Sequence, residues 1–76
     1  MKTYVFRIDL IEEEDGRWSA IAPDLPGCNA WGYTAQAAME AVRDNAQAYI
    51  EVLFEDGEEI PNGIEIISSP AVAVTV

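Results

Sequence analysis

The feature that most constrains this chain is one long segment with helical periodicity, from Ala35 to Phe54. Its apolar residues recur three or four positions apart and therefore share one face of a helix. They are Met39, Val42, Ala46, Tyr49, Ile50 and Leu53. Thr34 is a good N-cap residue, and Gly57 suits the position just after a helix C-terminus. A helix of this length in a chain of 76 residues must bury that face within the same small domain.

The residues before this helix alternate between apolar and polar side chains, a pattern typical of strands. Residues 3–11 and 17–22 both alternate in this way, and an Asp-Gly dipeptide between them is a strong hairpin signal. The two segments are therefore predicted to pair as an antiparallel hairpin. The inward face of the first is predicted to carry Tyr4, Phe6, Ile8 and Leu10. Residues 28–33 can form a short third strand, in which Gly32 indicates a bulge or a close approach of another element.

After a polar loop, residues 64–67 and 71–76 are predicted to form strands, separated by Ser68-Ser69-Pro70. The predicted order is β-β-β-α-β, an α+β fold in a single domain spanning residues 1–76. It consists of a small antiparallel sheet with one long helix packed on one face. A mass of 8.3 kDa leaves no room for a second lobe.

Charge and composition exclude several classes of function. The chain has 4 Lys and Arg against 14 Asp and Glu, a net charge of −10. This disfavours binding of nucleic acid or of anionic membranes by this chain, because both require cationic side chains. Since there is no His and only Cys28, a Ser-His-Asp triad, a His-ligated metal, a cysteine zinc site and an intrachain disulfide are excluded. Cys28 is predicted to be a small buried apolar residue.

The expected location is the cytoplasm, and no cofactor is expected. A lone cysteine suits a reducing compartment, and the sequence has no apolar run of the kind found in signal peptides or membrane spans.

Small domains commonly gain stability from disulfides, metals or association, and association is the leading expectation for this chain. A homo-oligomer, a dimer or a tetramer, is therefore predicted. The last predicted strand is apolar on both faces, which favours burial on both sides or a partner chain. Its predicted interface residues are Val72, Val74 and Val76.

Two acidic stretches are candidates for binding another protein. The run Glu12, Glu13, Glu14 and Asp15 is either a solvated hairpin tip or a patch complementary to a basic partner. The turn from Pro23 to Cys28 is either a rigid corner or a binding edge, in which Asp24 accepts hydrogen bonds from that partner. Trp18 is predicted to lie in the core, and Trp31 in the core or at an interface.

A two-cation nuclease site would need clustered carboxylates, for which the candidates are Asp9, Glu40 and Glu65. Asp9 is predicted on the outward strand face, and Glu40 lies beside the buried helix stripe rather than on it. These side chains need not converge, so no catalytic or metal-binding residue is predicted and the chain is not expected to be an enzyme.

Two stretches together resemble the HicB antitoxin family. One runs from Trp18 to the Pro-Asp-Leu-Pro-Gly-Cys motif that ends at Cys28, with Gly32 and Thr34 after it. The other is Glu-Asp-Gly-Glu-Glu-Ile-Pro at residues 55–61. The resemblance covers residues 4–67. It implies a partial RNase H-like fold without the nuclease carboxylates, and an antitoxin that directly binds and neutralises HicA, a small basic RNA-cleaving toxin.

The sequence also departs from the family pattern. Many members carry a C-terminal DNA-binding domain, and none is expected in a chain that ends at Val76. Tyr33 stands where an acidic residue usually precedes the threonine, and residues 35–38 lack the usual glutamates. The helix start thus loses carboxylates that favour its dipole, together with any partner contact made through them. These differences keep a second hypothesis open, an orphan HicB-like oligomeric interaction or scaffold module without a toxin partner.

Overall fold

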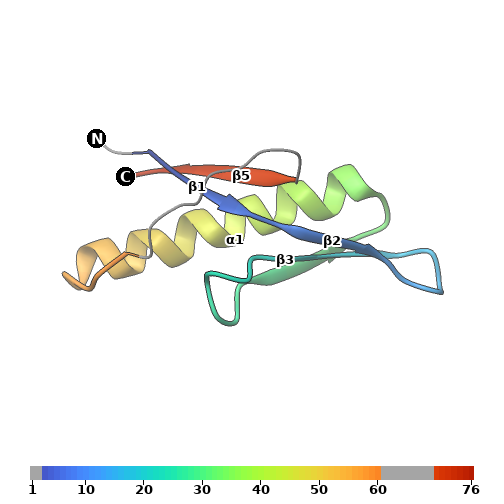
Figure 1. Ribbon diagram of the computed structural model, residues 1–76, viewed down its shortest axis with the longest axis horizontal. Helices are drawn as coiled ribbons and strands as arrows, with labels where there is room; N and C mark the ends of the chain where they lie inside the picture. The colour runs from blue at the N-terminus through green and yellow to red at the C-terminus, as the bar shows by residue number, and fades with distance from the viewer. Residues whose placement is uncertain (1–2, 61–69) are drawn as a thin grey trace.

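The computed structural model describes residues 3–60 and 70–76. Its elements, in order, are β1 (Thr3–Arg7), β2 (Asp9–Glu12), β3 (Trp18–Ile21), β4 (Asn29–Gly32), α1 (Ala35–Glu55) and β5 (Ala71–Thr75) (Figure 1). The predicted α+β order is confirmed, with the first predicted strand divided into β1 and β2. The strand predicted at residues 64–67 lies outside the described residues.

The N-terminal strand divides at Ile8 because its two halves pair along opposite edges. β1 pairs antiparallel with β5, whereas β2 belongs to a three-stranded antiparallel sheet of order β2-β3-β4. Ile8 lies between the halves, and its N–H donates to the carbonyl oxygen of Pro70 at 2.8 Å. Alternate residues of a strand present their backbone groups to opposite edges, so one extended segment can serve two neighbours.

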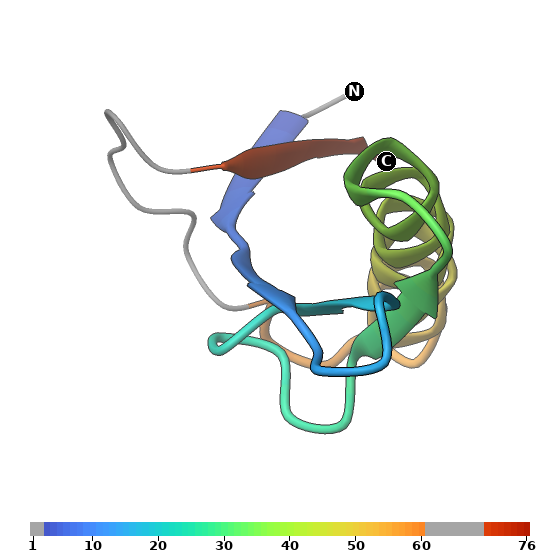
Figure 2. The same cartoon turned by 90° about the vertical axis from the view of Figure 1, so that its right-hand side faces the viewer.

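Helix α1 closes the side that the strands leave open. Seen nearly end-on, the strands curve around one side of the molecule and α1 fills the other (Figure 2). Two amide side chains of α1 bind the outermost strands. Asn45 Nδ2 donates to the carbonyl oxygen of Asn29 in β4, and Gln47 Nε2 donates to that of Thr75 in β5, both at 2.9 Å. The helix therefore satisfies carbonyl groups at both sheet edges, which would otherwise stay open for pairing.

The core lies between the two sheets and the helix. Its buried residues are Phe6, Ile8, Ala20, Ala22, Leu25, Cys28, Ala38, Val42, Ala46, Ile50, Val72 and Val74. The helix buries Ala38, Val42, Ala46 and Ile50, which are four residues apart and form a narrow stripe. The predicted stripe is confirmed at its centre, whereas its larger members Met39, Tyr49 and Leu53 pack only partly buried beside it.

Both predicted helix ends are confirmed. The Oγ1 atom of Thr34 accepts a hydrogen bond from the N–H of Ala37 at 3.0 Å, which caps the first turn. At the other end Gly57 has φ +71° and donates its N–H to Phe54, while Glu58 donates to Leu53. This pair of bonds is a Schellman motif, which satisfies carbonyls in the last turn.

Gly32 marks the point where β4 approaches the start of α1. A Cβ atom on Gly32 would lie 2.6 Å from the backbone nitrogen of Ala38 and 2.8 Å from the Cβ of Ala37. Backbone atoms cannot move away from an added Cβ atom as the flexible end of a long side chain can. The close approach predicted from the sequence is confirmed.

We expect Gly32→Ala to lower the free energy of unfolding by about 2 kcal/mol, the usual cost of overpacking a close contact. Gly32→Val should cost more, because the added methyl groups meet the same backbone. Urea unfolding followed by circular dichroism measures both values. Equal stability of the wild type and Gly32→Ala would show that the strand and helix can separate without penalty.

Strand β5 uses its apolar face within its own chain. Val72 and Val74 are 5% and 0% exposed in the core, and Val76 packs against that core partly buried. Their burial needs no second chain, which is the first of the two alternatives that the sequence left open, and a contribution of these residues to an interface stays a prediction. Association of the chain itself stays a prediction.

We expect Val74→Ala to lower the free energy of unfolding by about 2 kcal/mol, because two buried methyl groups are lost. The matched control is Val5→Ala on β1, where the valine is 38% exposed and the loss should be smaller. Denaturation at two protein concentrations tests the assignment. A core residue shifts the midpoint equally at both, and a loss that depends on concentration would place Val74 at an interface instead.

Candidate functional site

The acidic run begins at Glu12, the last residue of β2, and continues into the loop that joins β2 and β3. Glu13 donates its N–H to Arg17 O at 2.7 Å, and Gly16 donates to Glu13 O at 3.0 Å. Gly16 has φ +92°, a conformation that glycine adopts without steric cost in such hairpins. The predicted hairpin is confirmed, and Glu12, Glu13, Glu14 and Asp15 are all exposed on it.

Arg17 is the cation at the centre of this loop. Its Nε and Nη2 atoms donate to Asp15 Oδ2 at 2.8 and 2.7 Å, and its backbone N–H donates to Asp15 Oδ1 at 3.0 Å. The guanidinium carbon lies 5.2 Å from the centre of the Trp31 ring, within cation–π range. The hydrogen bonds from Arg17 hold the pKa of the Asp15 carboxyl below its ordinary value, and they raise the pKa of Arg17.

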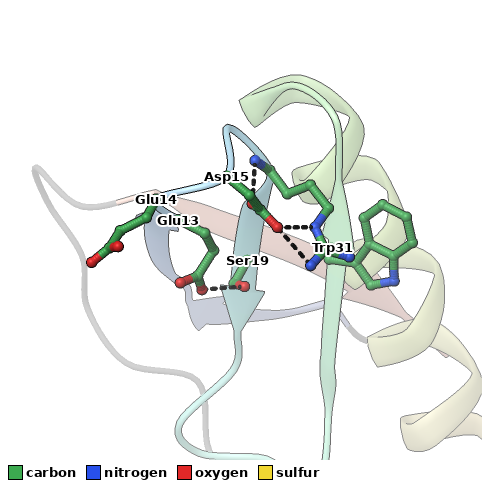
Figure 3. A pocket seen from close by; sticks show the side chains of 6 residues that line it. Glu13, Glu14, Asp15, Ser19 and Trp31 are labelled. Carbon is green, nitrogen blue, oxygen red and sulfur yellow. Dashed lines mark hydrogen bonds and ion pairs between the residues drawn. The ribbon is translucent and has the colours of Figure 1, made fainter.

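An open hollow of about 540 Å³ lies between the hairpin and β4 (Figure 3). Its lining residues are Glu13, Glu14, Asp15, Arg17, Ser19 and Trp31. Glu13 turns toward Ser19, whose hydroxyl donates to it at 2.7 Å, while Glu14 extends away from the other side chains (Figure 3). Small-molecule sites bury most of their ligand, so an open hollow suits side chains of another protein better.

The outward face of the three-stranded sheet carries a group of exposed apolar residues. We call this group the outer sheet face, formed by Ile11, Ser19, Ile21, Trp31 and Tyr33. Ile11 and Trp31 both lie opposite Ser19 in the strand register, so the three form one row across the sheet. Ile11 is 44% exposed and Trp31 is 51% exposed. Tyr33, just beyond β4, is 76% exposed and meets the Trp31 ring edge-to-face at 5.2 Å.

Sequence reasoning did not identify this surface as a whole. It placed Trp18 in the core, and the structure packs that residue partly buried against the core. It left Trp31 between the core and an interface, and the structure exposes Trp31. The signal was present, because Ile11 and Ile21 occupy the outward positions of alternating strands, where polar residues are expected.

Asp24 lies at the opposite end of β3 from the acidic hairpin. Its turn is held by Leu25, which is fully buried and whose N–H donates to Ala22 O at 3.0 Å. One carboxylate oxygen of Asp24 is buried and accepts no hydrogen bond from any described residue. The two predicted acidic contacts therefore belong to separate surfaces.

The carboxylates considered for a two-cation site do not meet among the described residues. Asp9 is on β2 and lies 3.8 Å from Arg7, whereas Glu40 is exposed on α1 and accepts from Gln36 at 3.3 Å. Glu65 lies outside the described residues. Within residues 3–60 and 70–76, no three His, Cys, Asp or Glu residues are grouped so as to hold a metal ion.

Cys28 is 4% exposed, as predicted, and burial raises the pKa of its thiol, which disfavours the nucleophilic thiolate. Within the described ranges, no helix is both long and apolar enough to cross a membrane.

Residues 4–71 match the family model described as the HicB_like antitoxin of bacterial toxin-antitoxin systems. The chain belongs to this family. The resemblance seen in the Pro-Asp-Leu-Pro-Gly-Cys and Glu-Asp-Gly-Glu-Glu-Ile-Pro motifs is thereby confirmed, over most of the chain.

HicB-like relatives of similar length occur in archaea and in a cyanobacterium. A UPF0150 protein of Thermoplasma acidophilum is 34% identical over 74% of this chain and 81% of its own length. One from Archaeoglobus fulgidus is 34% identical over 82% of this chain and 90% of its own length. One from Synechocystis is 28% identical over 93% of this chain and 90% of its own length.

Two solved structures share the fold. The N-terminal domain of the Burkholderia pseudomallei antitoxin HicB superposes with a TM-score of 0.74 at 22% identity, over 95% of this chain and 96% of that domain. The antitoxin HicB of the same organism superposes with a TM-score of 0.67 at 20% identity. That match covers all of this chain and 64% of the antitoxin, so the HicB-like chain spans about two thirds of its length.

We expect the Asp15 carboxyl to titrate below its ordinary value of 3.8 and to return toward that value in Arg17→Gln. Because the folded chain favours the carboxylate, the contact contributes stability above the ordinary pKa and loses it as the pH falls through the lowered pKa. Carbon-detected NMR titration measures both values. Arg43→Gln removes an equivalent cation from α1 and should leave the Asp15 pKa unchanged; a similar rise in both variants would show that Arg17 has no specific effect.

Proposed function

We propose that this HicB-like chain is an antitoxin that neutralises a small basic RNA-cleaving toxin of the HicA type by binding it directly. It acts by occupying the toxin surface and not by catalysis, in the cytoplasm where such a toxin cleaves RNA. The observation that carries the proposal is family membership, because the family model describes antitoxins of toxin-antitoxin systems.

The charge distribution supports a basic partner. Each arginine in the described ranges is already paired with a carboxylate, in the pairs Arg7–Asp9, Arg17–Asp15 and Arg43–Asp44. With a net charge of −10, most carboxylates lack an internal counter-ion. A protein that holds RNA carries cationic side chains, so it is complementary to this chain in charge. Such complementarity accelerates association and fixes orientation.

The hairpin carboxylates Glu12, Glu13, Glu14 and Asp15 are the proposed contacts with that partner. They are exposed at the end of the sheet, where a partner reaches them without a change of the fold. Asp24 is a second and separate proposed contact, since its turn lies at the other end of β3.

Co-expression with a small basic HicA-type protein, taken from beside this gene where one is encoded there, tests the proposal. With a tag on the toxin, we expect the acidic chain to co-purify at low salt and to suppress RNA cleavage in a stoichiometric manner. The complex should weaken as salt is raised, because the attraction between the charged surfaces is screened.

Failure to form a complex or to suppress cleavage would contradict the antitoxin role. Recovery of the chain by itself as a stable dimer or tetramer, with no such neighbour bound, would support the orphan interaction module instead. Light scattering at micromolar concentration measures that mass.

A further inference from the structure

We propose that the outer sheet face is the surface on which the basic partner docks, with Trp31 and Tyr33 as its anchors and the hairpin carboxylates as its charged rim. The identity of the partner as a toxin rests on the proposed function. The location of the surface and the cationic chemistry of its occupant rest on the structure.

Exposed apolar residues converge on this face from three strands. Ile11 on β2, Ile21 on β3 and Trp31 on β4 are 44%, 38% and 51% exposed. They do not belong to the core on the other side of the sheet. Tryptophan and tyrosine are enriched where interfaces gain most of their binding energy. A group of exposed apolar residues bordered by polar ones is typical of a protein interface.

The surface is also held in a fixed shape. Trp31 lies in the ladder opposite Ser19, and its ring is set by the edge-to-face contact with Tyr33 and by the guanidinium of Arg17. A partner therefore meets aromatic rings that are already positioned, which reduces the entropy lost on binding.

Charge decides what kind of protein can occupy the face. Two copies brought together there would each carry a net charge of −10. Like charges at close range oppose that contact. A partner with arginine or lysine side chains is favoured, because Glu13 and Glu14 line the same hollow as Trp31.

Arg17 shows how this surface holds a cation. Its guanidinium is bound by a carboxylate at 2.7 Å and lies 5.2 Å from the centre of the Trp31 ring. A carboxylate and an aromatic face together are a recognised site for a guanidinium. Trp31 remains half-exposed despite this contact, and Glu13 and Glu14 make no ion pair with a described residue, so the same chemistry is available to a side chain of the partner.

The test compares Trp31→Ala with Phe54→Ala, a control on α1 of nearly equal exposure, 53% against 51%. For charge, Glu13→Gln is compared with Glu58→Gln, which removes the same charge from an exposed position after the helix. Glutamine still accepts the hydrogen bond from Ser19, so the hairpin stays intact. Circular dichroism and thermal unfolding establish that each variant is folded before binding is measured.

Each variant is titrated calorimetrically against two probes, a small basic HicA-type protein and a decaarginine peptide. We expect Trp31→Ala to raise the Kd about tenfold or more, as loss of an interface anchor does, and Phe54→Ala to change it less than about twofold. Glu13→Gln should weaken binding more than Glu58→Gln. Equal losses in each pair would overturn the proposal and show that only overall charge matters.

The two probes separate this proposal from the proposed function. If the wild type binds the peptide but not the basic protein, the antitoxin role fails, and the peptide comparison still decides the location of the surface. If Trp31→Ala instead converts a dimer to a monomer in light scattering, the face binds a second copy and the proposal is wrong.

Discussion

The structure depends on one extended segment, residues 3–12, pairing on both of its edges. β5 occupies one edge of its first half and β3 occupies the opposite edge of its second half, with Ile8 at the change. This arrangement joins a two-stranded and a three-stranded sheet into one curved wall without a further strand. A curved wall encloses more apolar surface than a flat one, and here a single helix is enough to close it (Figure 2).

The packing of α1 against the strands affects both sheet edges and leaves the outer sheet face exposed. Asn45 and Gln47 bind the outermost strands from opposite sides of α1, so carbonyls at the edges are satisfied within the chain. The helix can lie close because its buried stripe includes two alanines and because Gly32 has no side chain at the contact. With the inner face covered by the helix, the outward sheet face remains exposed. Residues on that face can serve binding with little loss of folding stability, because they are not part of the core.

Several parts of this structure could be predicted from the sequence because they depend on local chemistry. The cap at Thr34, the Schellman motif at Gly57, the hairpin and the close approach at Gly32 follow from single residues whose backbone requirements are specific. The division at Ile8 could not be predicted, since the alternation continues through it and only the choice of neighbours changes. The burial of Val74 within its own chain could not be predicted for a related reason. An apolar strand has the same sequence whether its partner is its own core or a second chain.

The candidate site also combines features that the sequence predicts with features that it does not. The exposure of the acidic run follows from an Asp-Gly hairpin, but its position relative to Trp31 depends on the register between three strands, which no short motif specifies. The separation of Asp24 from the hairpin likewise depends on the length and direction of β3. Ile11 and Ile21 were the best available clue, since the core of the chain does not need an apolar side chain on the outward face of a small antiparallel sheet.

In the proposed complex, the chemistry of the outer sheet face explains how an acidic protein can displace RNA. A protein that binds RNA offers cations for phosphates and apolar or planar surfaces for bases. The outer sheet face offers carboxylates beside exposed aromatic rings, in a fixed arrangement. Carboxylates alone would be a weak competitor, because exposed ion pairs contribute little and are screened by salt. The rings supply apolar burial that salt does not weaken, so Trp31 and Tyr33 rather than the number of acidic residues should determine how tightly the partner is held.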